Sequence, residues 1–224
     1  MIKKINRFER KWIYRNNDHL TLINSLIRSN LFFKTHFPLR KVNSIYFDDK
    51  NFSSILENLD GVRNKKKIRL RWYGAKYKLD NPILEIKDKD AFVTKKTNYN
   101  VDKLNGVSIL DKKSLEFIRD TINKTVNSKS IIYPVLTTNY DRQYFISNNN
   151  KVRATVDYNL QSIYLKNFSQ INMIKNFAYK CILEIKYPTN IDNYVRENLE
   201  NMTLRLSKNS KFINSAVETP SFVI

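Results

Sequence analysis

The stretch Lys65-Lys66-Lys67-Ile68-Arg69-Leu70-Arg71-Trp72-Tyr73-Gly74 carries the pattern on which the fold prediction rests. Successive side chains of a β-strand point to opposite sides, so as a strand this stretch has one cationic face and one apolar face. The cationic face holds Lys67, Arg69 and Arg71, and the apolar face holds Ile68, Leu70 and Trp72. A helix fits less well, because its period would place the two arginines far apart around the cylinder. The stretch is therefore predicted as a strand, either a solvated edge strand or part of a larger charged surface.

Four further segments repeat this alternation and are predicted as strands over residues 6–14, 82–89, 151–160 and 178–187. Their charged faces hold Arg7, Glu9 and Lys11, then Glu85, Lys87 and Lys89, then Arg153, Thr155 and Asp157, and finally Glu184 and Lys186. Strands are also predicted over residues 42–47, 91–99 and 135–146, the second carrying Lys95 or Lys96 and the third Arg142. One charged strand would be an ordinary edge, but repetition across several strands favours a shared charged surface.

Amphipathic helices are predicted between the strands. The first covers residues 19–28, is capped by Asp18 and has an apolar stripe of Leu20, Ile23, Ile27 and Leu31. The second begins after Asp48 or Asp49 and ends at Gly61. Residues 101–130 are predicted as mostly helical, with Leu115, Ile118 and Ile122 buried, and residues 191–217 as a helix with a break near 207–210.

The charge balance points to a polyanionic partner. The chain has 224 residues, a length that fits one domain over residues 1–224, and its 42% hydrophobic and 27% charged residues are ordinary for a globular protein. Its 40 Lys and Arg against 21 Asp and Glu, however, give a formal charge of +19 at pH 7. Such an excess is typical of proteins that bind phosphates, nucleic acid or an anionic membrane.

Several kinds of chemistry and location are poorly supported by the composition. The single cysteine, Cys181, allows neither an intrachain disulfide nor a thiolate metal site, and it lies in an apolar run where we expect an inert buried thiol. His19 and His36 are the only histidines. The first residues lack the apolar region of a secretory signal, and there is no run of about 18 apolar residues. We therefore expect a cytoplasmic protein without a transmembrane segment.

Two architectures accommodate the alternating strands. Their charged faces lie either in water on the outside of a sandwich or barrel, or inside a closed barrel whose apolar exterior is covered by helices. The amphipathic helices favour the second, an α+β fold with a closed antiparallel β-barrel and a basic lumen. Arginine and lysine side chains in such a lumen repel one another until a polyphosphate chain fills it. The carboxylates among them, Glu9, Glu85, Asp157 and Glu184, either pair with neighbouring cations or hold Mg²⁺ or Mn²⁺, for which Glu184 is the favoured ligand.

Eight short blocks of this sequence, in this order, resemble successive blocks of the VTC (vacuolar transporter chaperone-like) polyphosphate polymerase domain. They are Arg7-Phe8-Glu9-Arg10-Lys11-Trp12, Ser44-Ile45-Tyr46-Phe47-Asp48, Lys67-Ile68-Arg69-Leu70-Arg71-Trp72-Tyr73, Leu84-Glu85-Ile86-Lys87, Tyr140-Asp141-Arg142, Arg153-Ala154-Thr155-Val156-Asp157-Tyr158-Asn159-Leu160, Leu183-Glu184-Ile185-Lys186-Tyr187 and Ser210-Lys211-Phe212. That family belongs to the triphosphate tunnel metalloenzymes, a CYTH-like superfamily whose antiparallel barrel encloses a basic tunnel.

The resemblance implies roles for individual residues. The residues expected to act in catalysis are Lys11, Arg69, Arg71, Arg142, Arg153 and Lys186. The residues expected to bind substrate are Arg7, Lys67, Lys87, Lys95, Ser210 and Lys211, with Lys208 as an alternative to Lys211. Glu184 is the implied metal ligand, and Glu9 fits the first-strand glutamate of bacterial relatives. The superfamily's usual Glu-x-Glu-x-Lys signature has Arg7 in place of its first glutamate here, which favours the polymerase branch.

The function expected from this resemblance is a metal-dependent polyphosphate polymerase. It would transfer the γ-phosphoryl group of a nucleoside triphosphate, ATP by expectation, to a growing polyphosphate chain, with Mn²⁺ or Mg²⁺ as cofactor. One alternative is a tripolyphosphatase or nucleoside triphosphatase in which water is the acceptor. The other is a non-enzymatic binder of polyphosphate or nucleic acid, which would gather its basic residues on an outer surface with exposed aromatic rings. We expect no specific nucleic-acid partner, and coupling of synthesis to translocation would need a separate membrane-protein partner.

Overall fold

The structure is a computed structural model that describes residues 7–14, 18–90, 93–127, 130–166, 169–177, 181–200, 202, 206–207 and 209–217. The chain divides into two compact units. Unit 1 comprises Met1–Arg40, Tyr140–Leu160 and Asn176–Asn209, and unit 2 comprises Lys41–Asn139, Gln161–Lys175 and Ser210–Ile224. Each unit is described by itself below.

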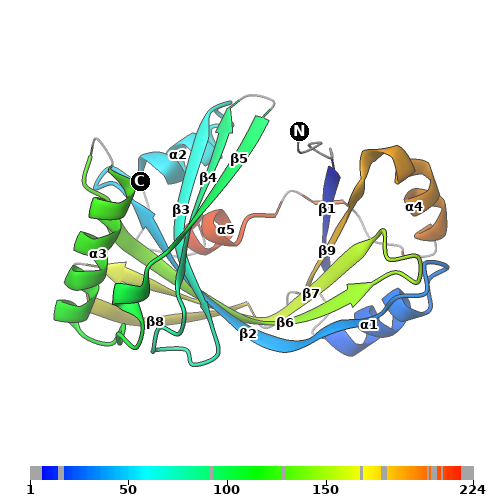
Figure 1. The fold of residues 1–224 in the computed structure, drawn as a ribbon, viewed down its shortest axis with the longest axis horizontal. Helices are drawn as coiled ribbons and strands as arrows, with labels where there is room; N and C mark the ends of the chain where they lie inside the picture. The colour runs from blue at the N-terminus through cyan, green and yellow to red at the C-terminus, as the bar shows by residue number, and fades with distance from the viewer. Residues whose placement is uncertain are drawn as a thin grey trace. The chain divides into compact units, whose positions relative to one another are not determined.

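Antiparallel strands are the main secondary structure of the described chain (Figure 1). They are β1 Arg7–Tyr14, β2 Lys34–Asp48, β3 Lys65–Tyr73, β4 Ile83–Asp90, β5 Val93–Asn100, β6 Tyr133–Ile146, β7 Arg153–Lys166, β8 Ser169–Phe177 and β9 Cys181–Pro188. The hydrogen-bonded order is β1-β9-β7-β6-β2-β3-β4-β5, and β8 pairs with β7. The antiparallel sheet agrees with the predicted fold class, and its closure into a barrel stays a prediction.

The helices are short. They are α1 His19–Ile27, α2 Ser53–Leu59, α3 Lys112–Val126, α4 Asp192–Asn198 and α5 Lys211–Val217, with 3₁₀ turns at Asp102–Leu104 and Thr189–Ile191. The Asp18 carboxylate caps α1 by accepting the Thr21 amide hydrogen at 3.0 Å, as the sequence predicts. Both candidate caps of α2 are used, since Asp48 accepts the Ser54 and Ile55 amides and Asp49 accepts the Ser53 amide. No helix among the described residues is long and apolar enough to span a membrane.

Unit 1 has its core on one side of its strands. Alternate residues of β9 and β7 are buried in this core, namely Leu183, Ile185, Ala154 and Val156. They pack with residues of α1 and with Val195 of α4, the helix that Figure 1 shows beside β9. The register pairs Glu9 with Lys186, Lys11 with Glu184 and Thr155 with Glu184. Residues that are directly opposite in a sheet share a face. Glu9, Lys11, Glu184 and Lys186 therefore lie together on the face that is opposite the core, as predicted, whereas Arg10 lies on the core side and pairs with Asp192.

Unit 2 separates the two faces of its sheet in the same way. Ile68, Leu70 and Trp72 are buried with Leu84 and Ile86 in a core to which α3 contributes Leu115, Ile118 and Ile122. The register places Arg69 opposite both Tyr46 and Glu85, and Lys67 opposite Lys87, so these residues share the other face.

The helix α5 packs on the charged face of unit 2 rather than on its apolar side. The Phe212 ring stacks on Tyr46 with centroids 4.8 Å apart, and Tyr46 shares its face with Arg69. The expectation that helices only cover the apolar exterior is therefore wrong for α5, while α3 fulfils it. This packing brings Ser210, the residue before α5, to the charged face.

Several predicted elements differ from the structure. Leu20 and Ile27 of α1 are 59% and 43% exposed, and Leu22 and Leu26 are buried in their place. Residues 101–111 are a 3₁₀ turn and loop rather than helix, because α3 begins only at Lys112. The predicted helix over residues 191–217 is two seven-residue helices, and β8 was not predicted.

Candidate functional site

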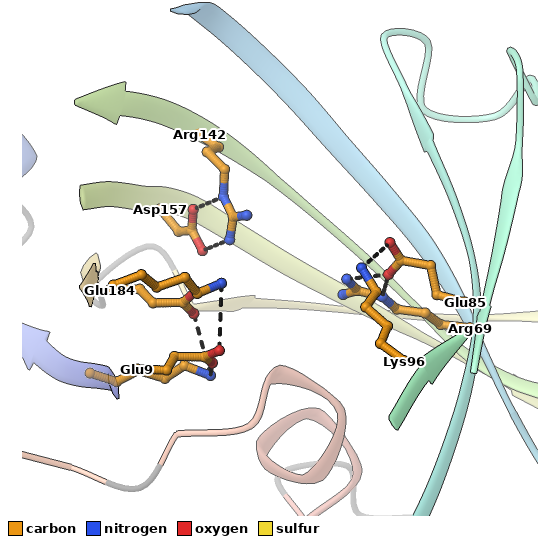
Figure 2. A network of polar contacts seen from close by, with 9 residues as sticks. Glu9, Arg69, Glu85, Lys96, Arg142, Asp157 and Glu184 are labelled. Carbon is orange, nitrogen blue, oxygen red and sulfur yellow. Dashed lines mark hydrogen bonds and ion pairs between the residues drawn. The ribbon is translucent and has the colours of Figure 1, made fainter. Parts of the chain in front are cut away.

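Two glutamates and two lysines alternate on the charged face of β1 and β9 in unit 1. The Lys11 Nζ atom lies 2.9 Å from Glu9 Oε1 and 3.3 Å from Glu184 Oε2. The Lys186 Nζ atom lies 2.5 Å from Glu184 Oε1 and 3.5 Å from Glu9 Oε2 (Figure 2). Each ammonium group is thus shared by both carboxylates. We call Glu9, Lys11, Glu184 and Lys186 the four-charge cluster.

The electrostatics of this cluster keep all its carboxylates ionised at neutral pH. Burial alone would raise the pKa of Glu184, but Lys186, Lys11 and Arg142 together hold it far below the ordinary value. Burial and Glu184 also oppose ionisation of Glu9, yet Lys11 and Lys186 lower its pKa. Burial works against the charged form of Lys11 as well, and the two glutamates more than offset it and raise its pKa. Ionised carboxylate oxygens are the ligands that hard divalent cations require.

A buried ion pair on β6 and β7 stands beside this cluster. The Arg142 guanidinium donates from Nε and Nη2 to the two oxygens of Asp157, at 2.5 and 2.7 Å. Asp157 has no exposed surface. Burial disfavours the charged guanidinium, but Asp157 and, more weakly, Glu184 raise the pKa of Arg142 well above its ordinary value. Asp157 therefore orients Arg142, which is the pairing role considered for it from the sequence.

The donor set of unit 1 fits a divalent cation that phosphate oxygens help to coordinate. Glu9 and Glu184 offer hard oxygen ligands, and the buried Thr155 hydroxyl, opposite Glu184 in the register, has no hydrogen-bond partner within the described part of the chain. Among the described residues, no group of three or more Asp, Glu, His or Cys side chains is placed to hold a metal ion. A cation here would need further oxygens from its substrate, as is usual for Mg²⁺.

Two further predicted phosphate ligands of unit 1 are exposed. Arg153 lies opposite Lys186 in the register, and Arg7 lies opposite Pro188 at the end of β1. Like charges directly opposite one another destabilise a sheet, so the Arg153 and Lys186 pair favours a bound anion. A cavity of about 550 Å³ on the other face of β1 and β9, lined by Trp12, Leu183 and residues of α4, includes none of the four-charge cluster.

The charged face of unit 2 is organised around one carboxylate. Glu85 is 2% exposed, and its Oε2 accepts from Arg69 Nε at 2.6 Å while its Oε1 lies 2.9 Å from Arg71 Nη2 and 2.8 Å from Lys96 Nζ (Figure 2). Burial would raise the pKa of Glu85, but Arg69, Lys96 and Arg71 lower it to about 2. Three cations on one carboxylate leave this group, the Glu85 cluster, with a net positive charge.

Lysines lie side by side next to the Glu85 cluster. The register places Lys67 opposite Lys87 and Lys87 opposite Lys96, so three ammonium groups cross three strands in one row. The Lys67 Nζ atom donates to the Ser210 hydroxyl at 3.0 Å, which fixes the segment before Lys211 at this row. Adjacent ammonium groups attract anions, and this row is therefore suited to bind phosphate oxygens.

Some of the predicted site residues lie elsewhere than the sequence predicts. Lys95 lies opposite Asp88, on the other face from Glu85, and Lys96 takes the place assigned to Lys95. The pairing of β4 with β5 fixes this register, and the sequence pattern alone left both lysines open. Lys208 lies outside the described residues. Arg69 and Arg71 belong to unit 2, while Arg142, Arg153 and Lys186 belong to unit 1, and their convergence on one enclosed cavity stays a prediction.

A family model described as the VTC domain matches residues 6–218. No curated protein matches the chain. A solved structure from Vibrio parahaemolyticus, described as a candidate adenylate cyclase, has a TM-score of 0.50 and 14% identity and covers 93% of this chain and 98% of its own.

Two other solved structures have the same likeness. One, from Hippeastrum, is described as a candidate adenylyl cyclase with a dominant triphosphatase activity; its TM-score is 0.50, its identity 13%, and the coverage 96% of this chain and 98% of that one. The other, a candidate adenylate cyclase from Bacillus halodurans, has a TM-score of 0.51, 14% identity and coverage of 90% and 92%. At this identity the likeness establishes the fold alone.

Proposed function

The chain belongs to the VTC domain family, and on that premise we propose that it is a metal-dependent polyphosphate polymerase. The reaction transfers the γ-phosphoryl group of a nucleoside triphosphate to the end of an inorganic polyphosphate chain. The observation that carries the proposal is the four-charge cluster with Arg142 beside it, which combines anion-binding cations with ionised carboxylates. In a protein that only bound polyanions, Glu9 and Glu184 would serve to orient Lys11 and Lys186; in the proposed enzyme they also supply the ionised oxygens that a divalent cation needs.

The residues of unit 1 have different proposed roles in phosphoryl transfer. Glu9 and Glu184 would hold the divalent cation that the family implies, Mn²⁺ or Mg²⁺, which would neutralise charge on phosphate oxygens. Lys11 and Lys186 exchange part of their contact with the glutamates for contact with phosphate oxygens. Arg142, held in place by Asp157, presents its guanidinium to a phosphate, to which guanidinium groups bind with fixed geometry.

Phosphoryl transfer of this kind needs positioning and charge neutralisation rather than a protein nucleophile. The only cysteine is accordingly unsuited to act as a nucleophile. Cys181 is 1% exposed, and its burial, together with the charge of Asp18, raises its pKa to about 11. The Glu85 cluster of unit 2 contributes phosphate binding, because three cations contact one carboxylate there, and the lysine row adds positive charge beside it. Arg69, Arg71, Lys67 and Lys87 are the phosphate ligands proposed there.

Hydrolysis is the second candidate function. The Hippeastrum protein with a related fold is described with a dominant triphosphatase activity, and this chain retains Glu9 on its first strand. The same residues would bind the same triphosphate, and the acceptor would be water instead of a phosphate chain.

Product analysis separates these functions. Purified protein is incubated with ATP and Mn²⁺, and the products are sized by gel electrophoresis and assayed for free phosphate. Polyphosphate chains that lengthen with time are expected. Release of phosphate without chains would identify a triphosphatase, and the absence of any turnover with Mn²⁺ or Mg²⁺ would reduce the proposal to phosphate binding.

A further inference from the structure

An aromatic and cationic surface lies on β2 and β6 of unit 1. The rings of Phe37 and Tyr144 meet edge to face, with centroids 5.8 Å apart and planes at 89°. The Arg40 Cζ atom lies 5.3 Å from the centroid of Phe37 and 5.5 Å from that of Tyr144. We call Phe37, Arg40 and Tyr144 the aromatic platform.

The Phe37 ring is accessible to a ligand. Phe37 is 43% exposed. The residues of β2 from Lys34 to Lys41 are all exposed except His36, which is half-buried. Protection of an edge strand against aggregation would account for the lysines and for Pro38 in this segment. It does not account for an exposed phenylalanine, which makes an edge more prone to association. With the Arg40 guanidinium and the Tyr144 ring against it, this exposed ring offers a surface on which a planar ligand can stack.

The platform is linked to the proposed phosphate site by one side chain. Tyr144 lies two residues after Arg142 on the same strand face, and the Arg142 Cζ atom is 6.0 Å from the Tyr144 ring centroid. Tyr144 is thus within cation–π range of both Arg40 and Arg142. A molecule with its phosphates at Arg142 and an aromatic group at Phe37 would span this tyrosine.

We propose that the aromatic platform binds the base of the nucleoside triphosphate, which stacks on the Phe37 ring. This inference rests on the proposed function, because it names the part of the substrate that the phosphate-binding residues do not contact. A stacked base gains affinity from its π-face, and the Arg40 guanidinium adds a cation–π contribution. Stacking on the phenylalanine ring uses no hydrogen bond to the edge of the base, so the stack itself does not distinguish adenine from guanine.

Paired ligands separate the base from the phosphates. Binding of ATP and of inorganic tripolyphosphate, which has no base, is measured by calorimetry in EDTA so that no turnover occurs. Phe37→Leu keeps an apolar side chain but removes the ring. It is expected to weaken ATP binding about five- to tenfold, the lower part of the range for loss of a base stack, and to leave tripolyphosphate binding unchanged.

Control variants test whether the effect belongs to this ring. Phe117→Leu on α3, a phenylalanine that is 47% exposed, should leave the binding of both ligands unchanged. Phe37→Trp should retain or strengthen ATP binding, and GTP should bind to the unaltered protein within about threefold of ATP. Thermal unfolding of each variant verifies that it is folded.

The outcomes distinguish this inference from the proposed function. Equal weakening of ATP and tripolyphosphate by Phe37→Leu, or no effect on either, would overturn the platform as a base site while phosphate binding stands. A failure of the unaltered protein to bind either ligand would instead overturn the proposed function and the inference that rests on it.

Discussion

The charged faces of unit 1 and unit 2 arise from the same strand alternation but differ in their balance of charge. In unit 1, two carboxylates share two lysines, and the side chains of Glu9 and Glu184 are 33% and 10% exposed. In unit 2, Glu85 retains 3% and is contacted by Arg69, Arg71 and Lys96. The first arrangement leaves carboxylate oxygens within reach of a cation, and the second encloses the Glu85 carboxylate in cations.

This difference assigns separate roles to glutamates that look equivalent in sequence. Glu85 and Glu184 each precede a lysine by two residues on a strand, in Glu85-Ile86-Lys87 and Glu184-Ile185-Lys186. Their partners across the neighbouring strands decide the outcome. Glu85 orients arginines that hold phosphate, whereas Glu184 is the carboxylate that we expect to hold the metal.

Glu184→Gln should have the largest effect on activity. The substitution keeps the shape of the side chain and removes the negative charge that a hard cation needs. Turnover is expected to fall at least a hundredfold, about 3 kcal/mol of transition-state stabilisation. Binding of tripolyphosphate in EDTA should hold or tighten, because a negative charge leaves an anion site. Steady-state kinetics and calorimetry measure both, with Glu197→Gln on α4 as the control that keeps normal turnover.

Glu85→Gln should act on stability rather than on metal binding. The cations around Glu85 lower its pKa to about 2 in the folded protein from an ordinary 4.5, so its stabilising contribution is present above pH 4.5 and is lost as the pH falls toward 2. The variant should lose on the order of 3 kcal/mol of stability at pH 7. Denaturant unfolding between pH 7 and pH 3 should show a smaller decline for the variant. An identical pH dependence in both proteins would mean that the neighbouring cations do not lower the pKa of Glu85.

Tripolyphosphate should stabilise the folded protein. At a ligand concentration of a hundred times Kd, the gain is about 2.7 kcal/mol, which corresponds to about 5–10 °C in Tm for a chain of this size. The shift should shrink with added salt, because screening acts over about 10 Å at 0.1 M. A scanning experiment at low and high salt tests this, and an unchanged Tm at millimolar ligand in low salt would contradict phosphate binding by either charged face.

Arg71→Ala should weaken binding and turnover together. It removes a guanidinium from the Glu85 cluster but no carboxylate from the four-charge cluster. A loss of about tenfold in tripolyphosphate affinity, or about 1.4 kcal/mol, is expected, with a similar fall in kcat/KM. Arg119→Ala on α3 is the matched control. If turnover fell a hundredfold with unchanged affinity, the separation between the two charged faces would be wrong.

The charged faces were predictable because strand alternation is a local property. The side on which Arg69, Glu85, Lys11 and Glu184 lie follows from the sequence once the segment is a strand, and the registers confirm it. Partners across strands depend on turns and pairing, which is why Lys96 rather than Lys95 reaches Glu85. The number of cations that contact Glu184 or Glu85 could not be predicted from either segment alone, because some of these cations lie on neighbouring strands.

The remaining misses have similar physical causes. The leucine-rich α1 has two overlapping apolar stripes, and packing on the sheet decides that Leu22 and Leu26 are buried. Phe37 belongs to a half-strand that is exposed on both sides, so it has no alternating pattern to mark it as part of a binding surface. The family resemblance named the phosphate ligands but gave no indication of the aromatic platform.

Direct measurement of Mn²⁺ binding tests the central distinction between the two charged faces. Electron paramagnetic resonance of free Mn²⁺ gives the affinity in the presence of saturating tripolyphosphate for the unaltered protein, Glu184→Gln and Glu85→Gln. We expect Glu184→Gln to weaken Mn²⁺ binding at least tenfold and Glu85→Gln, measured below its Tm, to change it less than threefold. Loss of Mn²⁺ binding in Glu85→Gln, with normal binding in Glu184→Gln, would place the metal in unit 2 and contradict this account.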